Sequence, residues 1–131
     1  MSGFSRNAMY DYVCDKVLEA YPDAYCSSVY ELVPESFPAV YIAEVNHRDV
    51  SNAVDLCGTD RQWRSTFQVQ VFSNKKEKMS ECVSIMDVVR EAFKTQMYSQ
   101  DLEQTLPNID PTIYRIVAEF SRTIGSGDEM K

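Results

Sequence analysis

The amino-acid sequence predicts an α+β domain of two layers, in which two helices cover one face of a mainly antiparallel four-stranded sheet. Hydrophobic periodicity is the first observation, because apolar residues alternate with polar ones at 67–71 and then recur every three or four residues from Met79 to Met97. The order of elements is the second, since three consecutive strands between two helices pair naturally as antiparallel neighbours. The length of 131 residues is the third and suits a single domain, whose ordered core we place at residues 5–124.

The chain opens with a predicted helix over residues 5–20. Ser5 is a suitable N-cap, and apolar residues recur along one face while acidic residues occupy the other. Pro22 ends this helix, because proline removes a hydrogen-bond donor and disfavours helical geometry in the residue before it. A first strand is predicted at residues 24–33.

Two further strands and a long arm between them are predicted next. The strand at residues 39–45 is apolar on both faces until Glu44, which is typical of a central strand. The following strand spans residues 64–73. Residues 46–63 between them are polar, contain Gly58 and show no sustained period, so we expect an extended loop that projects as an arm from the tip of a hairpin.

The second helix is predicted to begin at Asn74, where Glu77 three residues later resembles a capping box, and to run to about Met97. The helix has one continuous apolar face. It contains no catalytic motif, so we interpret it as a packing element.

The C-terminal part is predicted to be irregular and then extended. Two prolines, Pro107 and Pro111, predict an irregular segment at residues 99–111. A last strand follows at residues 112–124, and residues 125–131 are expected to form a flexible tail.

Charge and hydropathy exclude several classes of protein. The net charge of −7 argues against binding to nucleic-acid phosphates, and the only basic cluster, residues 75–78, is interrupted by an acid. No apolar run approaches the length of a membrane span. The N-terminal residues lack the features of a signal peptide, so we expect synthesis and retention in the cytosol.

The four cysteines, Cys14, Cys26, Cys57 and Cys82, are scattered and form no CxxC pair. Free and mostly buried thiols are the expected state in a cytosolic protein. With only His47 to join them, the sequence predicts no metal site and no cofactor.

Catalytic motifs are absent, and we predict that the chain is not an enzyme. His47 lies in an HRD tripeptide that lacks the remaining kinase signature, and pairing with Cys57 would require the loop to fold both together. Glu44 and Glu119 are both predicted on strands and form the one candidate carboxylate pair. No glycine pattern matches a phosphate-binding loop.

Apolar and aromatic residues exceed what one core of this size can bury. The first strands carry Tyr25, Tyr30, Phe37 and Tyr41, and Trp63 closes the arm. Exposed aromatic patches usually mark interfaces, so we expect part of this surface to contact another subunit.

These patterns together resemble the tail-terminator, or tail-completion, proteins of long-tailed bacteriophages. The resemblance covers most of residues 5–124. It is carried by the short N-terminal helix, the strand FPAVYIAEV, the polar insertion, and the module RSTFQVQVFSNKKEKMSECVSIMDVVREAF. The closing segment PNIDPTIYRIVAEFSRTI completes it.

The resemblance implies a virion protein located in the tail or neck and assembled in the host cytoplasm. Such proteins form a ring, usually a hexamer, at the head-proximal end of the tail tube, where they stop tube polymerisation. The implied partners are further copies of the chain, the tail-tube protein and the head–tail connector protein. DNA would pass through the lumen without sequence-specific binding, which an acidic protein suits. The expected subunit or tube contacts lie in the 46–63 arm and are His47, Arg48, Asp49, Asp60, Arg61 and Trp63.

Alternative functions remain open at this point. Another head–tail connector, a head-closure ring or a minor capsid component would differ only in its docking partner. A small-molecule-binding or enzymatic α+β domain would instead require a concave pocket with convergent polar groups. An adaptor or chaperone-like module is the third class.

Overall fold

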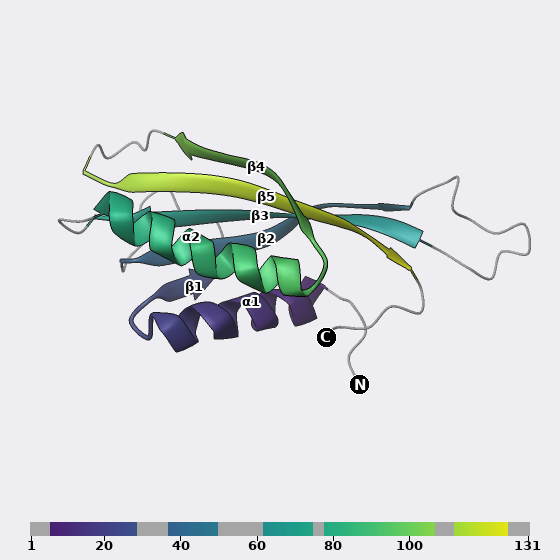
Figure 1. The fold of residues 1–131 in the computed structure, drawn as a ribbon, viewed down its shortest axis with the longest axis horizontal. Coiled ribbons are helices and arrows are strands. Elements are labelled where there is room, and N and C mark those ends of the chain that lie inside the picture. Colours follow the sequence, from purple (N-terminus) through teal and green to yellow (C-terminus); the bar gives the residue numbers. More distant parts are fainter. Residues whose placement is uncertain (1–5, 29–36, 50–61, 75–77, 107–111, 126–131) are drawn as a thin grey trace, which may run out of the picture.

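A computed structural model describes residues 6–28, 37–49, 62–74, 78–106 and 112–125. It confirms the α+β class, because two helices pack on one face of a single mixed sheet (Figure 1). The elements, in chain order, are α1 (Arg6–Ala20), β1 (Tyr25–Ser27), β2 (Ala39–Asp49), β3 (Gln62–Ser73), α2 (Lys78–Thr95), β4 (Ser99–Leu106) and β5 (Tyr114–Gly125).

Within the described residues, the sheet has five strands in the order β1-β2-β3-β5-β4. The pairs β2–β3, β3–β5 and β4–β5 are antiparallel, so the sheet is mainly antiparallel, as predicted. The expected antiparallel pairing of the first two strands was wrong, because β1 runs parallel to β2 and pairs with residues 39–41 only. The peptide bond between Phe37 and Pro38 is cis. Residues 29–33 of the predicted first strand lie outside the described residues, and β1 itself ends at Ser27.

The predicted strand count of four was wrong, because residues 99–106 form a regular strand, β4, where we expected an irregular segment. This strand lies at the edge of the sheet, and all its side chains but the last are exposed. It therefore shows no apolar alternation, and its backbone pairing with β5 has no signature in its own sequence. The ladder is offset by one residue at Asp101.

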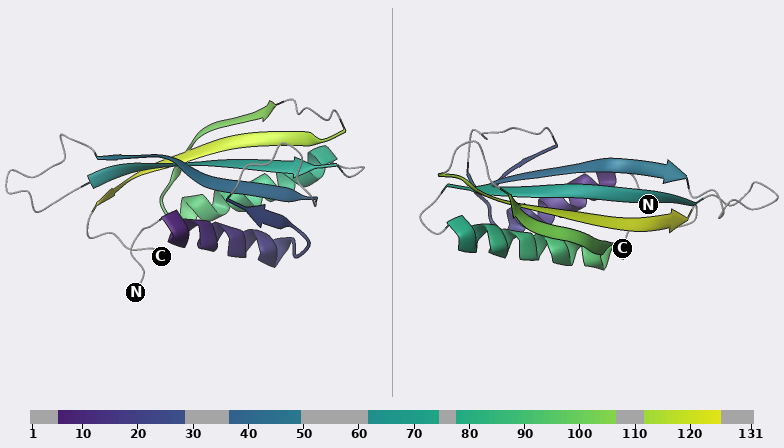
Figure 2. Two further views of the ribbon diagram at one scale, coloured as in Figure 1. Left: turned by 180° about the vertical axis from the view of Figure 1, so that it is seen from behind. Right: turned by 90° about the horizontal axis from the view of Figure 1, so that it is seen from above.

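The predicted bounds of the 46–63 arm were too wide, because strand pairing continues into it from both ends. β2 extends to Asp49 and β3 begins at Gln62, with a register shift at Val45 between Glu44 and Asn46. β2, β3 and β5 all run past the end of α2, so that three strands extend beyond the helical layer (Figure 2). Residues 50–61 lie outside the described residues.

The C-terminus of α2 ends in a Schellman motif. The Tyr98 N–H donates to the Phe93 carbonyl at 2.9 Å, and the Met97 N–H donates to the Lys94 carbonyl at 2.9 Å. Met97 takes a left-handed backbone conformation with φ of 68°, a position that usually selects glycine. At the other end, the helix begins at Lys78, and Glu77 of the predicted capping box lies outside the described residues.

The main core lies between the helices and the sheet and is centred on four aromatic rings. Phe93 stacks on Phe120 with centroids 4.5 Å apart, and it also contacts Tyr98 at 5.2 Å and Phe67 at 5.6 Å. Phe67, Phe93 and Phe120 are almost completely buried. The rings join the last turn of α2 to the centre of β3 and β5, next to the point where the strands leave the helical layer.

A second, smaller core lies on the opposite face of the sheet. Ala39 and Phe72 alternate with the main-core residues of their strands, and they bury together with Ile113. Tyr25, Phe37 and Tyr41 pack against this cluster. Three of the aromatic residues that we expected at a subunit interface therefore pack within the chain. The fourth, Tyr30, lies outside the described residues.

Candidate functional site

The structure places four of the six sequence-predicted contact residues at the end of the β2–β3 hairpin that adjoins residues 50–61. His47, Arg48 and Asp49 are the last residues of β2 and pair in register with Ser65, Arg64 and Trp63 of β3. Asp60 and Arg61 lie outside the described residues. The pairing brings four of the six predicted positions onto two adjacent strands, on the part of the sheet that extends past the helices.

Trp63 joins this extension to the core. It is half-buried, packs against the main hydrophobic cluster, and lies opposite the buried Ile124 of β5 in the ladder. Part of the indole therefore contributes to the core, and its exposed part could be covered by another molecule. Such a residue has both a stability role and a contact role.

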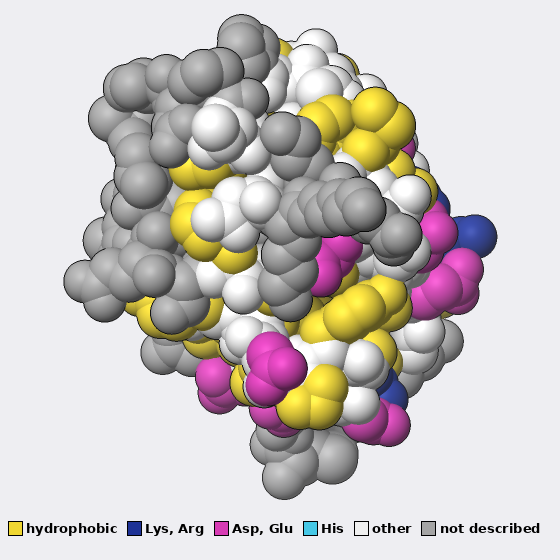
Figure 3. Space-filling view, turned by 90° about the vertical axis from the view of Figure 1, so that its left-hand side faces the viewer, with side chains coloured by type: hydrophobic (Ala, Val, Ile, Leu, Met, Phe, Trp, Pro, Cys, Tyr) yellow, Lys and Arg dark blue, Asp and Glu magenta, His cyan; other side chains and the backbone are white. Residues whose placement is uncertain are grey.

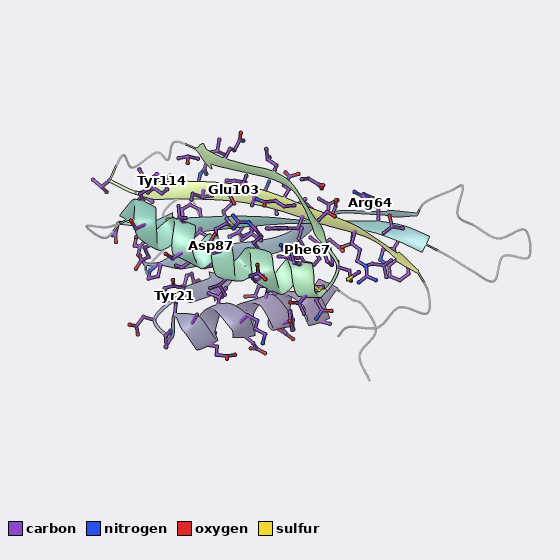
Figure 4. All side chains as sticks on the ribbon, viewed as in Figure 1. Tyr21, Arg64, Phe67, Asp87, Glu103 and Tyr114 are labelled. Carbon is purple, nitrogen blue, oxygen red and sulfur yellow. The ribbon has the colours of Figure 1, made fainter. Side chains whose placement is uncertain are left out.

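Arg64 lies on the other face of the sheet from Trp63 because successive strand residues alternate. Its guanidinium donates to the Ser121 hydroxyl at 2.7 Å and to the Thr123 hydroxyl at 3.3 Å, and Ser121 in turn donates to the Asp101 carboxylate. This network ties β3, β5 and β4 together at the root of the extension, where Arg64 is seen beyond the end of α2 (Figure 4).

A second network lies on the helix-facing side of the same region. The Tyr98 hydroxyl donates to the Ser65 hydroxyl at 3.0 Å, and Ser65 donates to the Glu44 carboxylate at 2.7 Å. Burial raises the pKa of Tyr98 to about 12. Arg122 donates to the Gln96 carbonyl at 2.7 Å, which joins β5 to the end of α2.

The carboxylate pair suggested by the sequence does not form. Glu44 is bound through Ser65 on the helix-facing side, whereas Glu119 accepts from the Gln68 amide at 3.4 Å on the opposite face. The sheet lies between the two groups, so they cannot share a proton or a water molecule. We find no paired acid and base at these positions.

Three described cysteines are free thiols, and Cys57 lies outside the described residues. Cys14 and Cys26 are hydrogen-bonded across α1 and β1, and the hydrogen bond from Cys26 lowers the pKa of Cys14 to about 7 while the pKa of Cys26 is raised. Burial raises the pKa of Cys82 to about 12. Among the described residues, no group of three histidine, cysteine or acidic side chains could hold a metal ion.

A groove of about 650 Å³ lies on the outer surface between α1 and α2. Its floor is formed in part by Val88 and Ala92, and its rim carries three acids and one lysine. Lys16 lies over the ring of Tyr12 at 5.6 Å. No histidine, cysteine or serine is among the residues that line this groove.

Acidic side chains also lie beside apolar ones at the end of the molecule that carries the start of α2 (Figure 3). No helix in the described part of the chain combines the length and apolar character that a membrane crossing requires.

Sequence reasoning identified the region of the extension but missed the residues that hold it together. Arg64 and Ser121 could have been found from strand alternation, because each is a polar residue opposite an apolar face. Asp101 could not, since it belongs to the strand that the sequence did not reveal. Tyr98 was also missed, because its hydroxyl meets Ser65 only through the fold.

Comparison with known proteins reveals a shared fold. No protein-family model matches the sequence, and no curated protein matches it. Among solved structures, a chain of the "Virion of native gene transfer agent (GTA) particle" is similar, with a TM-score of 0.64 and 12% sequence identity. The similarity covers 89% of this chain and 94% of that one. At this identity it shows that the two chains have the same fold over nearly their whole lengths.

Proposed function

We propose that this chain is a virion structural protein that forms a ring at the head-proximal end of a phage tail tube. In this role it ends tube polymerisation and joins the tail to the head connector. One observation carries the proposal: the fold over 89% of this chain is shared with a chain of a gene transfer agent virion. The order of sequence modules, which resembles tail-terminator proteins, supports the same role independently.

The sheet extension supports a contact role within such a ring. β2, β3 and β5 project past the helices, and polar networks on both faces hold the root of the projection. A projecting and rigidly based element can reach a neighbouring subunit or the tube without distorting the core. His47, Arg48, Asp49 and Trp63 lie on this projection and are the proposed contacts. Asp60 and Arg61, between the two strands in sequence, are proposed with them.

We propose a structural and not an enzymatic role. Glu44 and Glu119 bind neighbouring side chains on opposite faces of the sheet, and no histidine, cysteine or serine lines the groove between the helices. An acidic net charge of −7 suits a ring through which DNA passes without adhering. A head-closure or other connector ring would use the same fold and would differ in its docking partner.

The groove between α1 and α2 supports one alternative of a different class, because its size lies in the range of small-molecule sites. A ligand there would contact Val88 and Ala92 between acidic side chains. Val88→Trp would fill the groove. The alternative expects this variant to lose a bound ligand, whereas the ring proposal expects its tail-joining activity to be unchanged.

A tube-growth assay tests the proposed function. The tail-tube protein of the same phage is polymerised with and without this chain, and tube length is measured by electron microscopy. We expect tubes to stop growing when the chain is added, and we expect light scattering to show copies of the chain associating at the concentrations that stop growth. Unaltered tube lengths at a large excess of the chain would contradict the proposal.

A further inference from the structure

The sheet has two open stretches of edge within the described residues. β4 pairs with β5 on one side and with no described strand on the other. At the opposite edge, β1 covers residues 39–41 of β2, and no described strand pairs with β2 beyond them on that side. An exposed edge presents unpaired backbone donors and acceptors and can pair with another chain.

Exposed apolar side chains occur on the strands at both of these edges. Val45 on β2 is 49% exposed, and Leu102 on β4 is 38% exposed. The other large apolar side chains that are exposed in the described part of the chain lie on the helices or on the turn after α2. Each open edge therefore has one apolar residue that pairing with another strand could bury.

The strand directions permit the two edges to meet in a ring. Following the antiparallel pairs across the sheet, β4 runs opposite to β2. A rotation about an axis that follows the strands leaves strand directions unchanged. The β4 edge of one copy would therefore meet the β2 edge of the next as an antiparallel pair, which is the geometry of the other junctions between β2 and β4.

The charges at the two edges are compatible with such contact. β4 contains two acids and no basic residue, while the far end of β2 contains His47 and Arg48. Both acids of β4 are already held within the subunit, Asp101 by Ser121 and Glu103 by Arg90. Close approach of the two edges would therefore not place unpaired charges of the same sign against each other.

We infer that copies of this chain join edge to edge, with β4 of one copy pairing with residues 45–49 of β2 in the next. The contact is heterologous, so each copy offers one edge and accepts the other, and repetition closes a ring with a continuous sheet. This inference rests on the proposed ring function and adds the interface that would build it. The occupant of each edge is a second copy, and not the tail-tube protein.

Charged substitutions at the two apolar residues test the inference. Leu102→Glu and Val45→Glu each place a carboxylate on one edge, and both sites are exposed in the single subunit, so we expect folding to be retained. Association of copies should weaken at least about tenfold for each variant. Met79→Glu makes the same change in charge on α2, where Met79 is 59% exposed, and should associate like the wild type.

Mixing the two edge variants tests the heterologous geometry. Leu102→Glu retains a normal β2 edge, and Val45→Glu retains a normal β4 edge. These two normal edges can pair with each other, but the two altered edges that remain cannot pair. We expect the mixture to stop at a dimer by light scattering, at a concentration at which the wild type forms rings. Rings formed by either variant alone, or no dimer in the mixture, would overturn the edge pairing.

A proline pair provides a backbone test. Gln104→Pro and Thr105→Pro remove the N–H of consecutive residues, and in a strand one of these groups faces β5 while the other faces outward. We expect one variant to have a lowered melting temperature, and the other to fold normally but fail to associate. Normal association of both would overturn the inference. Failure of the wild type to associate even with tail tubes would instead contradict the proposed function.

Discussion

Phe93 offers the sharpest test of how the helical layer is held on the sheet, and we predict that Phe93→Ala destabilises the fold strongly. The ring is fully buried and contacts three other aromatic rings, the closest being Phe120 at 4.5 Å. Truncation of a buried phenylalanine typically costs about 3–5 kcal/mol through lost burial and the cavity that remains. With three aromatic neighbours fixed by β3, by β5 and by the turn after α2, little collapse can fill the space, so we expect about 4 kcal/mol.

The assay is urea unfolding followed by circular dichroism, supported by thermal melting. At about 3–4 °C per kcal/mol for a domain of this size, the melting temperature should fall by roughly 12–16 °C. Phe93→Leu should cost less, about 1–2 kcal/mol, because it leaves a smaller cavity. Met79→Ala, on the exposed side of α2, should change the free energy of unfolding by less than about 0.5 kcal/mol. A loss below about 1 kcal/mol for Phe93→Ala would refute this account of the core.

Four further substitutions follow from the same structure. Trp63→Ala should cost about 1–2 kcal/mol, because the indole is half-buried, and should also weaken tube binding measured by co-sedimentation; unchanged binding would exclude the contact role. Tyr98→Phe should reduce the loss of stability at alkaline pH. Because burial raises the pKa of Tyr98 to about 12, its neutral phenol contributes stability that is present below pH 10 and is lost as pH rises towards 12, by at most about 3 kcal/mol. Urea midpoints at pH 9 and 11 would measure this difference. Met97→Gly should stabilise by about 0.5–1 kcal/mol in thermal melting, because glycine tolerates the φ of 68° that methionine does not favour. Arg90→Ala should cost no more than about 1 kcal/mol, yet should speed hydrogen exchange in β4, because Arg90 joins α2 to Glu103; unchanged exchange would show that the ion pair does not hold the strand.

The parts of the fold that the sequence predicted well are those whose own residues contact the core. Phe67, Val69 and Val71 alternate because one face of β3 is buried, and Phe93 continues an apolar face that packs on that strand. In both elements, the spacing of apolar residues within the segment is enough to predict its structure. It could therefore be read without knowledge of the partners, and α1, α2 and β3 were placed close to their observed bounds.

The parts that were missed depend on pairing between distant segments. β4 is a polar edge strand that is held by backbone hydrogen bonds to β5 and by Arg90 from α2. The ends of β2 and β3 that extend past the helices are also polar. They are held by pairing with a neighbouring strand and not by burial in the core. Asp87 and Glu103 both bind Arg90, but Asp87 is three residues before it on the same helix, whereas Glu103 comes from β4. Both acids are labelled in Figure 4.

The candidate site could be located from the sequence only as a region. The polar insertion after residue 45 marked where the chain leaves the core, and Trp63 marked its return. The networks around Arg64 and Tyr98 required the register of three strands and the turn after α2, which no local pattern contains. The cluster around Phe72 likewise reduced the aromatic surface that had been assigned to an interface.

If copies of this chain cap a tail tube as a ring, cryo-electron microscopy of tube ends should reveal that ring. Tubes of the tail-tube protein would be mixed with the wild-type chain, and both tube ends would be imaged and averaged separately. We expect an added ring on one end only, with density that fits this fold in each subunit. Bare tube ends, or density spread along the length of the tube, would contradict it.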